Sequence, residues 1–280
     1  MKINSELPLT MLQENLRLNE YDFVLFHLYI QYPEYREYYK NLRTTHPDRL
    51  MILDNSAYEF FVKGEKLNLE EYKNAVIDLH PDMYILPDIL MSKENTLRVT
   101  FDFLAFYEIE IIKAFANTGI TVPKPLAVTQ GNTALELFEC LLKYHHEHIH
   151  NVALPFHNSF YKEYYDDETA NRFRSIFGAL NDDHRYAMGR IRFVKDAALM
   201  LQQFDHVHLL GSHCPAEKVF HKDYIHTIDT GYPVKCGIAG YKMFEEPAKP
   251  DIIIDDFMTT ELTATQQSLI DMNINKFKNL

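Results

Sequence analysis

Short runs of apolar residues recur along the chain, and longer segments with helical spacing separate them. Runs of this length that are rich in β-branched and aromatic residues predict strands, and amphipathic segments predict helices. The predicted strands cover residues 21–30, 50–56, 82–90, 124–131, 151–157, 206–213 and 224–233, with 236–241 as a candidate for a last short one. The predicted helices cover residues 68–79, 93–119, 132–147, much of 167–204 and the C-terminal segment.

This alternation of strands and helices predicts a parallel sheet in an α/β protein. The runs are continuously apolar, which is typical of strands that are covered on both faces. About eight such units predict a (β/α)8 TIM-type barrel, formed by residues 1–280 as a single domain and irregular at the last strands. A doubly wound open sheet is the alternative, but no GxGxxG segment follows the first predicted strand.

The composition favours a cytoplasmic protein. Three cysteines, Cys140, Cys214 and Cys236, lack CxxC spacing, so a disulfide framework is not expected and a reducing compartment fits best. The N-terminal segment lacks the apolar run of a signal peptide, and no stretch approaches the roughly 20 apolar residues of a membrane span. We therefore expect no membrane association.

The net charge of −12 argues against broad, non-specific binding to nucleic acid, which needs many cations against phosphates. A local basic face is still compatible with this charge. The segment 172–195 is rich in arginine and includes Arg190 and Arg192. These side chains predict either a polynucleotide contact or, as the simpler alternative, solvated helix faces.

Most of the predicted strands finish on a polar side chain. The residues at these ends are Asp54, Asp88, Gln130, His157, Ser212, His213 and Asp229. In a barrel the carboxyl ends of all strands open at one mouth, where catalytic groups lie, so this pattern predicts an active site. One such residue alone is equally well explained by turn chemistry, because Asp, Asn and Ser favour chain reversals.

The residue types predict which chemistry this mouth performs. Carboxylates in a partly buried mouth push their pKa values apart, so that one acts as a nucleophile and another as an acid or base. Asp88 and Gln130 offer acceptors and donors that suit the edge of a planar base. Gly131 and Gly211 leave room for a flat ligand, and Tyr58 stacks on it or packs in the core.

Five segments that contain these residues carry a family resemblance. They are LDNSAYE, LPDIL, AVTQG, HLLGSHCPAEKVF and IHTIDTGYPVKCGIAG, in this order along residues 50–240. Together they resemble the tRNA-guanine transglycosylase superfamily, which includes relatives that insert 7-deazaguanines into DNA. That resemblance implies a (β/α)8 barrel that exchanges guanine in a polynucleotide for a modified base through a covalent Asp–sugar intermediate.

The resemblance also implies roles for individual residues. Asp229 matches the nucleophile, Asp54 the general acid/base, Asp88 the base-recognition residue, and Gln130 with Gly131 the Val-Gln-Gly-Gly segment. Further substrate-binding candidates are Ser56, Tyr58, His157 and Gly211. The candidates for nucleic-acid contact are Lys235, Lys242, Arg190 and Arg192.

The chain departs from the family pattern at several places. The family's Cys-x-Cys-x-x-Cys…His zinc site is missing, so we expect no metal and no cofactor. VALPFHNSF stands in place of a glycine-rich loop, which gives His157 a new role. His213, Cys214 and Cys236 lack the usual spacing of zinc ligands, although a metal site there stays open.

The sequence therefore predicts a base-exchange glycosyltransferase, with DNA favoured over tRNA as the polymer and a 7-deazaguanine as the incoming base. Two alternatives stay open: a non-catalytic accessory subunit of such an enzyme, and a metal-dependent barrel hydrolase or lyase that uses His157, His213 and the carboxylates. The sequence leaves a homodimer open as well.

Overall fold

The computed structural model describes residues 1–156, 158–177, 180–221, 224–243 and 257–280. Within these ranges eight strands are hydrogen-bonded in the order β1-β8-β7-β6-β5-β4-β3-β2, and every recorded register is parallel. The strands are β1 (Lys2–Ser5), β2 (Asp22–Leu25), β3 (Met51–Asp54), β4 (Met83–Ile85), β5 (Lys124–Val128), β6 (Asn151–Pro155), β7 (His206–Leu210) and β8 (Thr227–Thr230). The predicted fold class, an α/β protein with a (β/α)8 TIM-type barrel, is confirmed.

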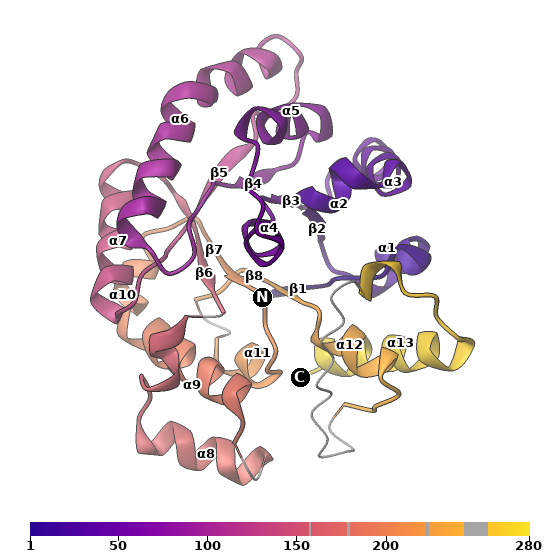
Figure 1. Ribbon diagram of the computed structural model, residues 1–280, viewed down its shortest axis with the longest axis vertical. Helices are drawn as coiled ribbons and strands as arrows, with labels where there is room; N and C mark the ends of the chain where they lie inside the picture. The colour runs from indigo at the N-terminus through magenta and orange to yellow at the C-terminus, as the bar shows by residue number, and fades with distance from the viewer. Residues whose placement is uncertain (157, 178–179, 222–223, 244–256) are drawn as a thin grey trace. The chain divides into compact units, whose positions relative to one another are not determined.

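Helices separate most of the strands along the chain (Figure 1). The α-helices are α1 (Asn15–Leu18), α2 (Phe26–Gln31), α3 (Pro33–Thr45), α4 (Ala57–Lys63), α5 (Leu69–Leu79), α6 (Lys93–Phe115), α7 (Ala134–His146), α8 (Asp167–Phe177), α9 (Asp182–Asp196), α10 (Ala198–Leu201), α11 (Ala216–Phe220), α12 (Tyr232–Ile238) and α13 (Ala264–Lys278). Short 3-10 helices are η1 (Leu9–Glu14), η2 (Ser159–Lys162) and η3 (Phe257–Thr259).

The chain divides into two compact units. Unit 1 comprises Met1–Glu20, Ser159–Ala198 and Leu209–Leu280, and unit 2 comprises Tyr21–Asn158 and Leu199–His208. The prediction of a single domain over residues 1–280 is not tested by this division.

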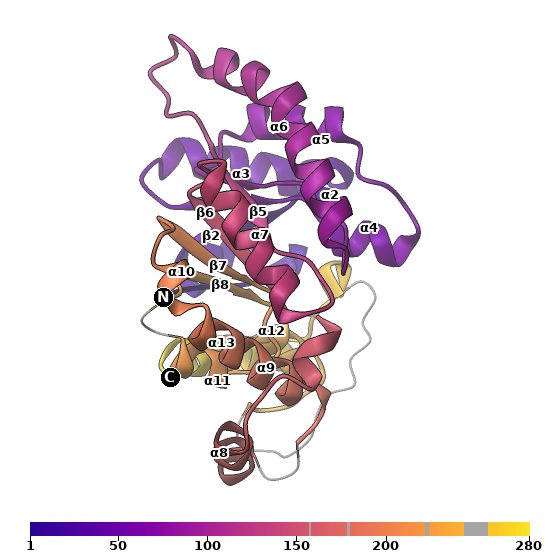
Figure 2. The ribbon, with the colours of Figure 1, turned by 90° about the vertical axis from the view of Figure 1, so that its left-hand side faces the viewer.

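In unit 2, strands β2, β3, β4 and β6 are buried along their whole length, as their continuous apolar sequences predict. Helices α5 and α6 lie side by side (Figures 1 and 2). Tyr72 of α5 is fully buried, and its ring contacts Phe26 and Phe103. Its hydroxyl donates to the carbonyl of Ile85 over 2.6 Å, which fixes this helix on the sheet.

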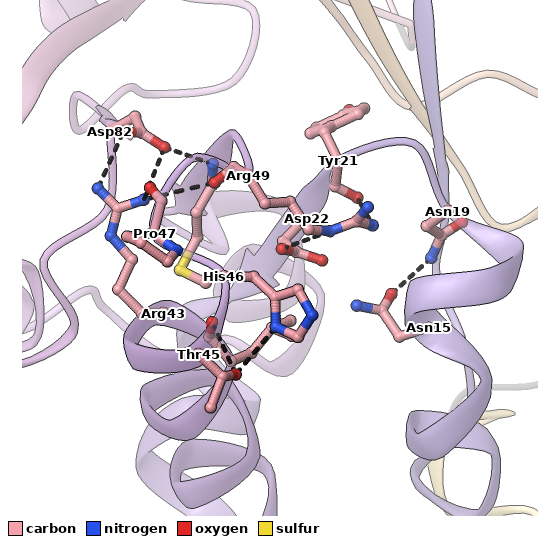
Figure 3. A network of polar contacts seen from close by, with 12 residues as sticks. Asn15, Asn19, Tyr21, Asp22, Arg43, Thr45, His46, Pro47, Arg49 and Asp82 are labelled. Carbon is pink, nitrogen blue, oxygen red and sulfur yellow. Dashed lines mark hydrogen bonds and ion pairs between the residues drawn. The ribbon is translucent and has the colours of Figure 1, made fainter.

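Ion pairs hold the amino ends of β2, β3 and β4 (Figure 3). Arg49 donates to the buried carboxylate of Asp22 over 2.9 Å, and Arg43 donates to both oxygens of Asp82 over 2.9 and 3.1 Å. Asp82 also accepts from the backbone N–H of Met51 over 2.7 Å. These contacts tie the first residue of β2 to Arg49, just before β3, and the first residue of β3 to Asp82, just before β4.

In unit 1, helices α12 and α13 pack closely (Figure 1). Gly237 permits this approach, because a Cβ atom there would lie 2.4 Å from a side-chain carbon of Ile270. Asn273 of α13 is buried, accepts from the N–H of Met243 and donates to the carbonyl of Tyr241, over 2.9 Å in each case. The predicted C-terminal helix is thus part of unit 1.

The structure corrects four details of the predicted elements. β1 was not predicted, and the candidate last strand, residues 236–241, is not a strand, because its first half belongs to α12. The run 21–30 is a strand only as far as Leu25, after which α2 begins. Helix α6 ends at Phe115, before the predicted stop at Gly119.

Candidate active site

The polar segment that follows β3 forms a sharp turn into α4. Asp54 accepts from the N–H of Ser56 and Asn55 accepts from the N–H of Ala57, over 2.8 Å in each case. Ser56 has a φ of 55°, a left-handed conformation that is uncommon for a residue with a Cβ atom. The turn chemistry suggested by the sequence is therefore present. It holds Asp54, which is only 8% exposed, at the carboxyl end of the strand.

Ser56 also binds His27, which follows β2 and was not among the predicted site residues. The Ser56 hydroxyl accepts from the N–H of His27 over 3.1 Å and lies 2.9 Å from the ring atom Nδ1. Burial, together with the charge of Lys63, lowers the pKa of His27 to about 4. The imidazole is therefore neutral at pH 7, and His27 holds the left-handed turn from the first turn of α2.

Asp88 lies beyond the carboxyl end of β4 at the centre of a hydrogen-bonded cluster. The Asn55 amide donates to its Oδ1 over 2.9 Å, and the Gln130 amide donates to its Oδ2 over 2.7 Å. Asn55 also donates to the carbonyl of Leu86 over 2.8 Å, and Gln130 accepts from the N–H of Met91 over 3.0 Å. Residues that follow three adjacent strands therefore meet here, and we call Asn55, Asp88 and Gln130 the amide–carboxylate cluster.

Burial is the main influence on Asp88, and it raises the pKa of this carboxyl group even though the two amide hydrogen bonds act in the opposite direction. Each carboxylate oxygen has two lone pairs, so both can accept a further N–H from a ligand. A ligand that supplies such donors would favour the ionised form. The cluster therefore has the chemistry to bind a group with adjacent N–H donors.

The structure gives Gly131 a packing role. A Cβ atom at this position would lie 2.6 Å from Cβ of Glu136 in the first turn of α7. The Glu136 carboxylate accepts from the N–H of Asn132, which closes the turn between β5 and α7. The predicted contact of Gly131 with a flat ligand stays a prediction.

Three further residues follow strands of unit 2 at their carboxyl ends. Tyr58 is 51% exposed on α4, so its ring is accessible, and stacking on a ligand stays a prediction. His157 lies outside the described residues. Asn158, which was not predicted, is fully buried beyond β6, and neither side-chain atom has a hydrogen-bond partner in the described part of the chain. A buried amide of this kind can bind a ligand atom.

In unit 1, Asp229 of β8 is 3% exposed. The backbone N–H of Gly211, just beyond β7, donates to its Oδ1 over 2.9 Å. Gly211 has a φ of 58°, a conformation that glycine adopts without strain. The structure thus brings together two of the predicted residues, Asp229 and Gly211.

Glu6 is a neighbour of Asp229 that sequence reasoning missed. Its carboxyl group hydrogen-bonds to Asp229, and its backbone N–H donates to the carbonyl of Thr230 over 3.1 Å. Burial, followed by the charge of Asp229, raises the pKa of Glu6 to about 8. Burial also raises the pKa of Asp229 to about 6, against the Gly211 N–H and the charge of Arg190.

The prediction that Arg190 contacts nucleic acid is wrong for this structure. Its side chain is fully buried and forms a two-point ion pair with Glu217, with both distances 2.7 Å. It also donates to the carbonyls of Leu210 over 2.9 Å and Gly211 over 2.7 Å. Arg190 therefore fixes the segment whose N–H binds Asp229, and it has no exposed surface for a phosphate.

The other predicted cations differ in exposure. Arg192 is partly exposed and pairs with Asp166 over 2.7 Å and with Asp196 over 2.8 Å. Lys242 is exposed, whereas Lys235 on α12 is partly buried and its charge acts on Glu6. A contact of these three side chains with a polynucleotide stays a prediction.

Asp54 belongs to unit 2 and Asp229 to unit 1. The predicted meeting of the two carboxylates around one ligand stays a prediction. Among the described residues, no three His, Cys, Asp or Glu side chains are grouped so that they could hold a metal ion. No helix in the described ranges has both the length and the apolar character needed to cross a membrane.

No protein-family model matches the sequence, and no curated protein matches it.

Proposed function

We propose that the protein is a base-exchange glycosyltransferase that replaces guanine in a polynucleotide with a 7-deazaguanine. The observation that carries the proposal is the amide–carboxylate cluster, because it holds a partly buried carboxylate between two amides at adjacent strand ends. Guanine presents two adjacent N–H donors and a carbonyl on one edge. Asp88 suits the donors, and the Gln130 amide suits the carbonyl.

Asp229 is the proposed nucleophile. The Gly211 N–H donates to its Oδ1 and so orients the buried carboxylate, which allows a carboxylate oxygen to attack a reacting carbon. In the first step this oxygen bonds to the anomeric carbon, the C1′–N9 bond breaks, and its electron pair goes to the departing base. Asp54 supplies the proton that the base takes up.

The second step reverses the first with a different base. Asp54 accepts the proton from N9 of the incoming 7-deazaguanine, that nitrogen attacks the anomeric carbon, and the Asp229 carboxylate leaves. The proposal needs both aspartates and the amide–carboxylate cluster to act on one nucleotide. The fold class supports it, since catalytic residues of a TIM-type barrel come from the ends of several strands.

Single-stranded or distorted DNA is the favoured polymer. The net charge of −12 gives little general attraction for a structured RNA, so binding depends on local contacts. A base in a duplex must be flipped out of the stack before its glycosidic bond is reached, and unpaired bases avoid this cost.

The test is incorporation of labelled guanine into single-stranded DNA, duplex DNA and tRNA by the purified protein. We expect label in single-stranded DNA first and a protein–DNA adduct that survives denaturation. Asp229→Asn abolishes both, whereas the control Asp205→Asn, at an exposed carboxylate before β7, retains both.

Other outcomes of this test contradict the proposal in different ways. Undiminished exchange by Asp229→Asn would exclude this nucleophile. Release of free base without incorporation indicates a hydrolase, and binding of DNA without any reaction indicates an accessory subunit.

A further inference from the structure

The proximity of Glu6 and Asp229 follows from the pairing of β1 with β8 within unit 1. Asn4 of β1 lies opposite Asp229 of β8, and Ser5 lies opposite Thr230. Side chains alternate along a strand, so Glu6 continues the face of β1 that carries Asn4 and is level with the end of β8. The bond from the Glu6 N–H to the carbonyl of Thr230 extends the pairing by one residue and fixes this placement.

The charged groups around the pair act on each carboxyl separately. Lys235 of α12 favours the ionised form of Glu6, and Arg190 of α9 favours the ionised form of Asp229. The Gly211 N–H already occupies Oδ1 of Asp229. Two carboxyl groups can hydrogen-bond to each other only when one of them carries a proton, because an ionised carboxylate only accepts.

We propose that Glu6 is a positioning residue for Asp229, whose carboxyl group keeps a proton and donates it in a hydrogen bond to the ionised Asp229 carboxylate. This inference rests on the proposed function, in which Asp229 attacks the sugar. Between the Gly211 N–H and the Glu6 carboxyl, the Asp229 carboxylate is held in one orientation and in its ionised form. Glu6 gives up no proton in the transfer step, since the proton for the departing base comes from Asp54.

The direction of the pKa shifts agrees with this assignment. Both values are raised, and Glu6, at about 8, holds its proton more tightly than Asp229, at about 6. Below the lower value both groups are protonated, and above the higher value both are ionised and repel each other. The pair therefore holds a single proton around neutral pH, as a coupled unit rather than as two independent acids.

A titration that does not depend on activity tests the pair directly. Carboxyl carbons of the full-length protein are labelled with carbon-13 and followed by nuclear magnetic resonance between pH 4 and pH 10. We expect Glu6 to titrate well above the range of an ordinary glutamate and Asp229→Asn to move that titration back toward it. Glu14→Gln, at a partly exposed carboxylate paired with Arg17, is the control and leaves both titrations unchanged.

The pH profile of base exchange tests the role of the pair. In the unaltered protein we expect activity to rise near pH 6 and fall near pH 8, as the coupled pair loses its first and then its second proton. Glu6→Gln keeps a donor that cannot ionise, so the fall at high pH disappears. Glu6→Ala removes the donor, so the rise shifts to higher pH and kcat drops on the order of tenfold.

The two measurements separate the failure of this inference from that of the proposed function. An ordinary titration of Glu6, or identical pH profiles for Glu6→Gln and the unaltered protein, overturns the positioning role even if base exchange is found. A coupled titration in a protein that transfers no base overturns the proposed function and leaves the shared proton in place.

Discussion

At the amino ends of β2 to β4, the carboxylates of Asp22 and Asp82 each face an arginine, whereas beyond the carboxyl ends of β3 to β5 the carboxylate of Asp88 faces two amides. Both regions belong to unit 2, and both lie at the ends of adjacent strands. They differ in what balances the charge.

An arginine partner neutralises a carboxylate and uses its lone pairs in fixed geometry, which stabilises the fold but leaves little for a ligand. Amides hold a carboxylate in place without neutralising it. Burial disfavours the ionised form of Asp88 and so raises its pKa, and a ligand with N–H donors would stabilise that ionised form. The comparison indicates that carboxylates near the strand ends are fixed by arginines at the amino end, whereas at the carboxyl end Asp88 keeps the capacity to accept a ligand; the carboxyl end is where barrels of this class place their sites.

The largest expected effect comes from breaking the ion pair at the amino end. Arg49→Met leaves the fully buried Asp22 carboxylate without its arginine, and we expect the free energy of unfolding to fall by about 3 kcal/mol. Denaturant unfolding measures this loss. Base exchange by the folded fraction should be unchanged, because Arg49 lies away from the carboxyl ends.

Two variants control for this result. Arg36→Met, in an exposed contact of 3.9 Å with Glu37, should cost less than about 1 kcal/mol. Adding Asp22→Asn to Arg49→Met removes the buried charge and should recover part of the loss. Equal losses for Arg36→Met and Arg49→Met would contradict the structural role of the amino end.

A change at the carboxyl end should have the opposite profile. Asp88→Asn removes the charged acceptor, and we expect kcat/KM for base exchange to fall about 10- to 100-fold, the value of one hydrogen bond to a charged group. Its effect on the free energy of unfolding depends on pH. Because the pKa of Asp88 is raised in the folded protein, its stabilising contribution is present below the unfolded pKa and is lost as the pH rises through the folded value.

Asp78 serves as a control, because its pKa is shifted in the opposite direction to that of Asp88. Burial acts to raise its pKa, but hydrogen bonds from Lys40 and Tyr29 outweigh burial and lower it. Its contribution to stability is therefore lost as the pH falls. The stability difference between the unaltered protein and each variant should decrease with rising pH for Asp88→Asn and increase for Asp78→Asn. If both stability differences changed with pH in the same direction, the pKa values of Asp88 and Asp78 would not be shifted in opposite directions.

The sequence predicted the strands that are buried on both faces, because a run such as MILDNS has an apolar body and an abrupt polar end. It did not predict β1, whose sequence KINS carries Asn4 and Ser5 in buried positions. The backbone of Ser5 is paired with the side chain of Asn19 from a distant part of the chain. No local sequence pattern could reveal these hydrogen bonds. Glu6 was therefore missed together with β1, the strand that it follows.

Arg190 was misassigned although its sequence held a usable signal. In α9 the buried residues Ala187, Ile191 and Val194 recur at helical spacing, and Arg190 falls on the same face. Arg192 lies off that face and is partly exposed. The spacing therefore indicated a buried arginine, but its partner Glu217, 27 positions away, becomes apparent only in the folded chain.

The smallest expected effect comes from backbone strain at Ser56, near the carboxyl end of β3, and at His80, near the amino end of β4. Variants at these two residues separate the effect of strain from the effect of side-chain contacts. Ser56 and His80 both adopt a left-handed conformation, with φ values of 55° and 57°, one after β3 and the other before β4. At each site the glycine variant should be more stable than the alanine variant by about 1 kcal/mol, because only alanine keeps a Cβ atom in that conformation. Strain is thus expected to be alike at the two ends.

Activity should distinguish the two sites. Ser56→Gly and Ser56→Ala both lose the hydroxyl that binds His27, so both should lower kcat to a similar extent, whereas the two variants of His80 should not change it. Denaturant unfolding and steady-state kinetics on the four proteins measure these quantities. If Ser56→Gly kept full activity while Ser56→Ala lost it, backbone conformation rather than the hydroxyl contact would govern the carboxyl end. The contrast between the two ends would then lie in how much strain each end tolerates.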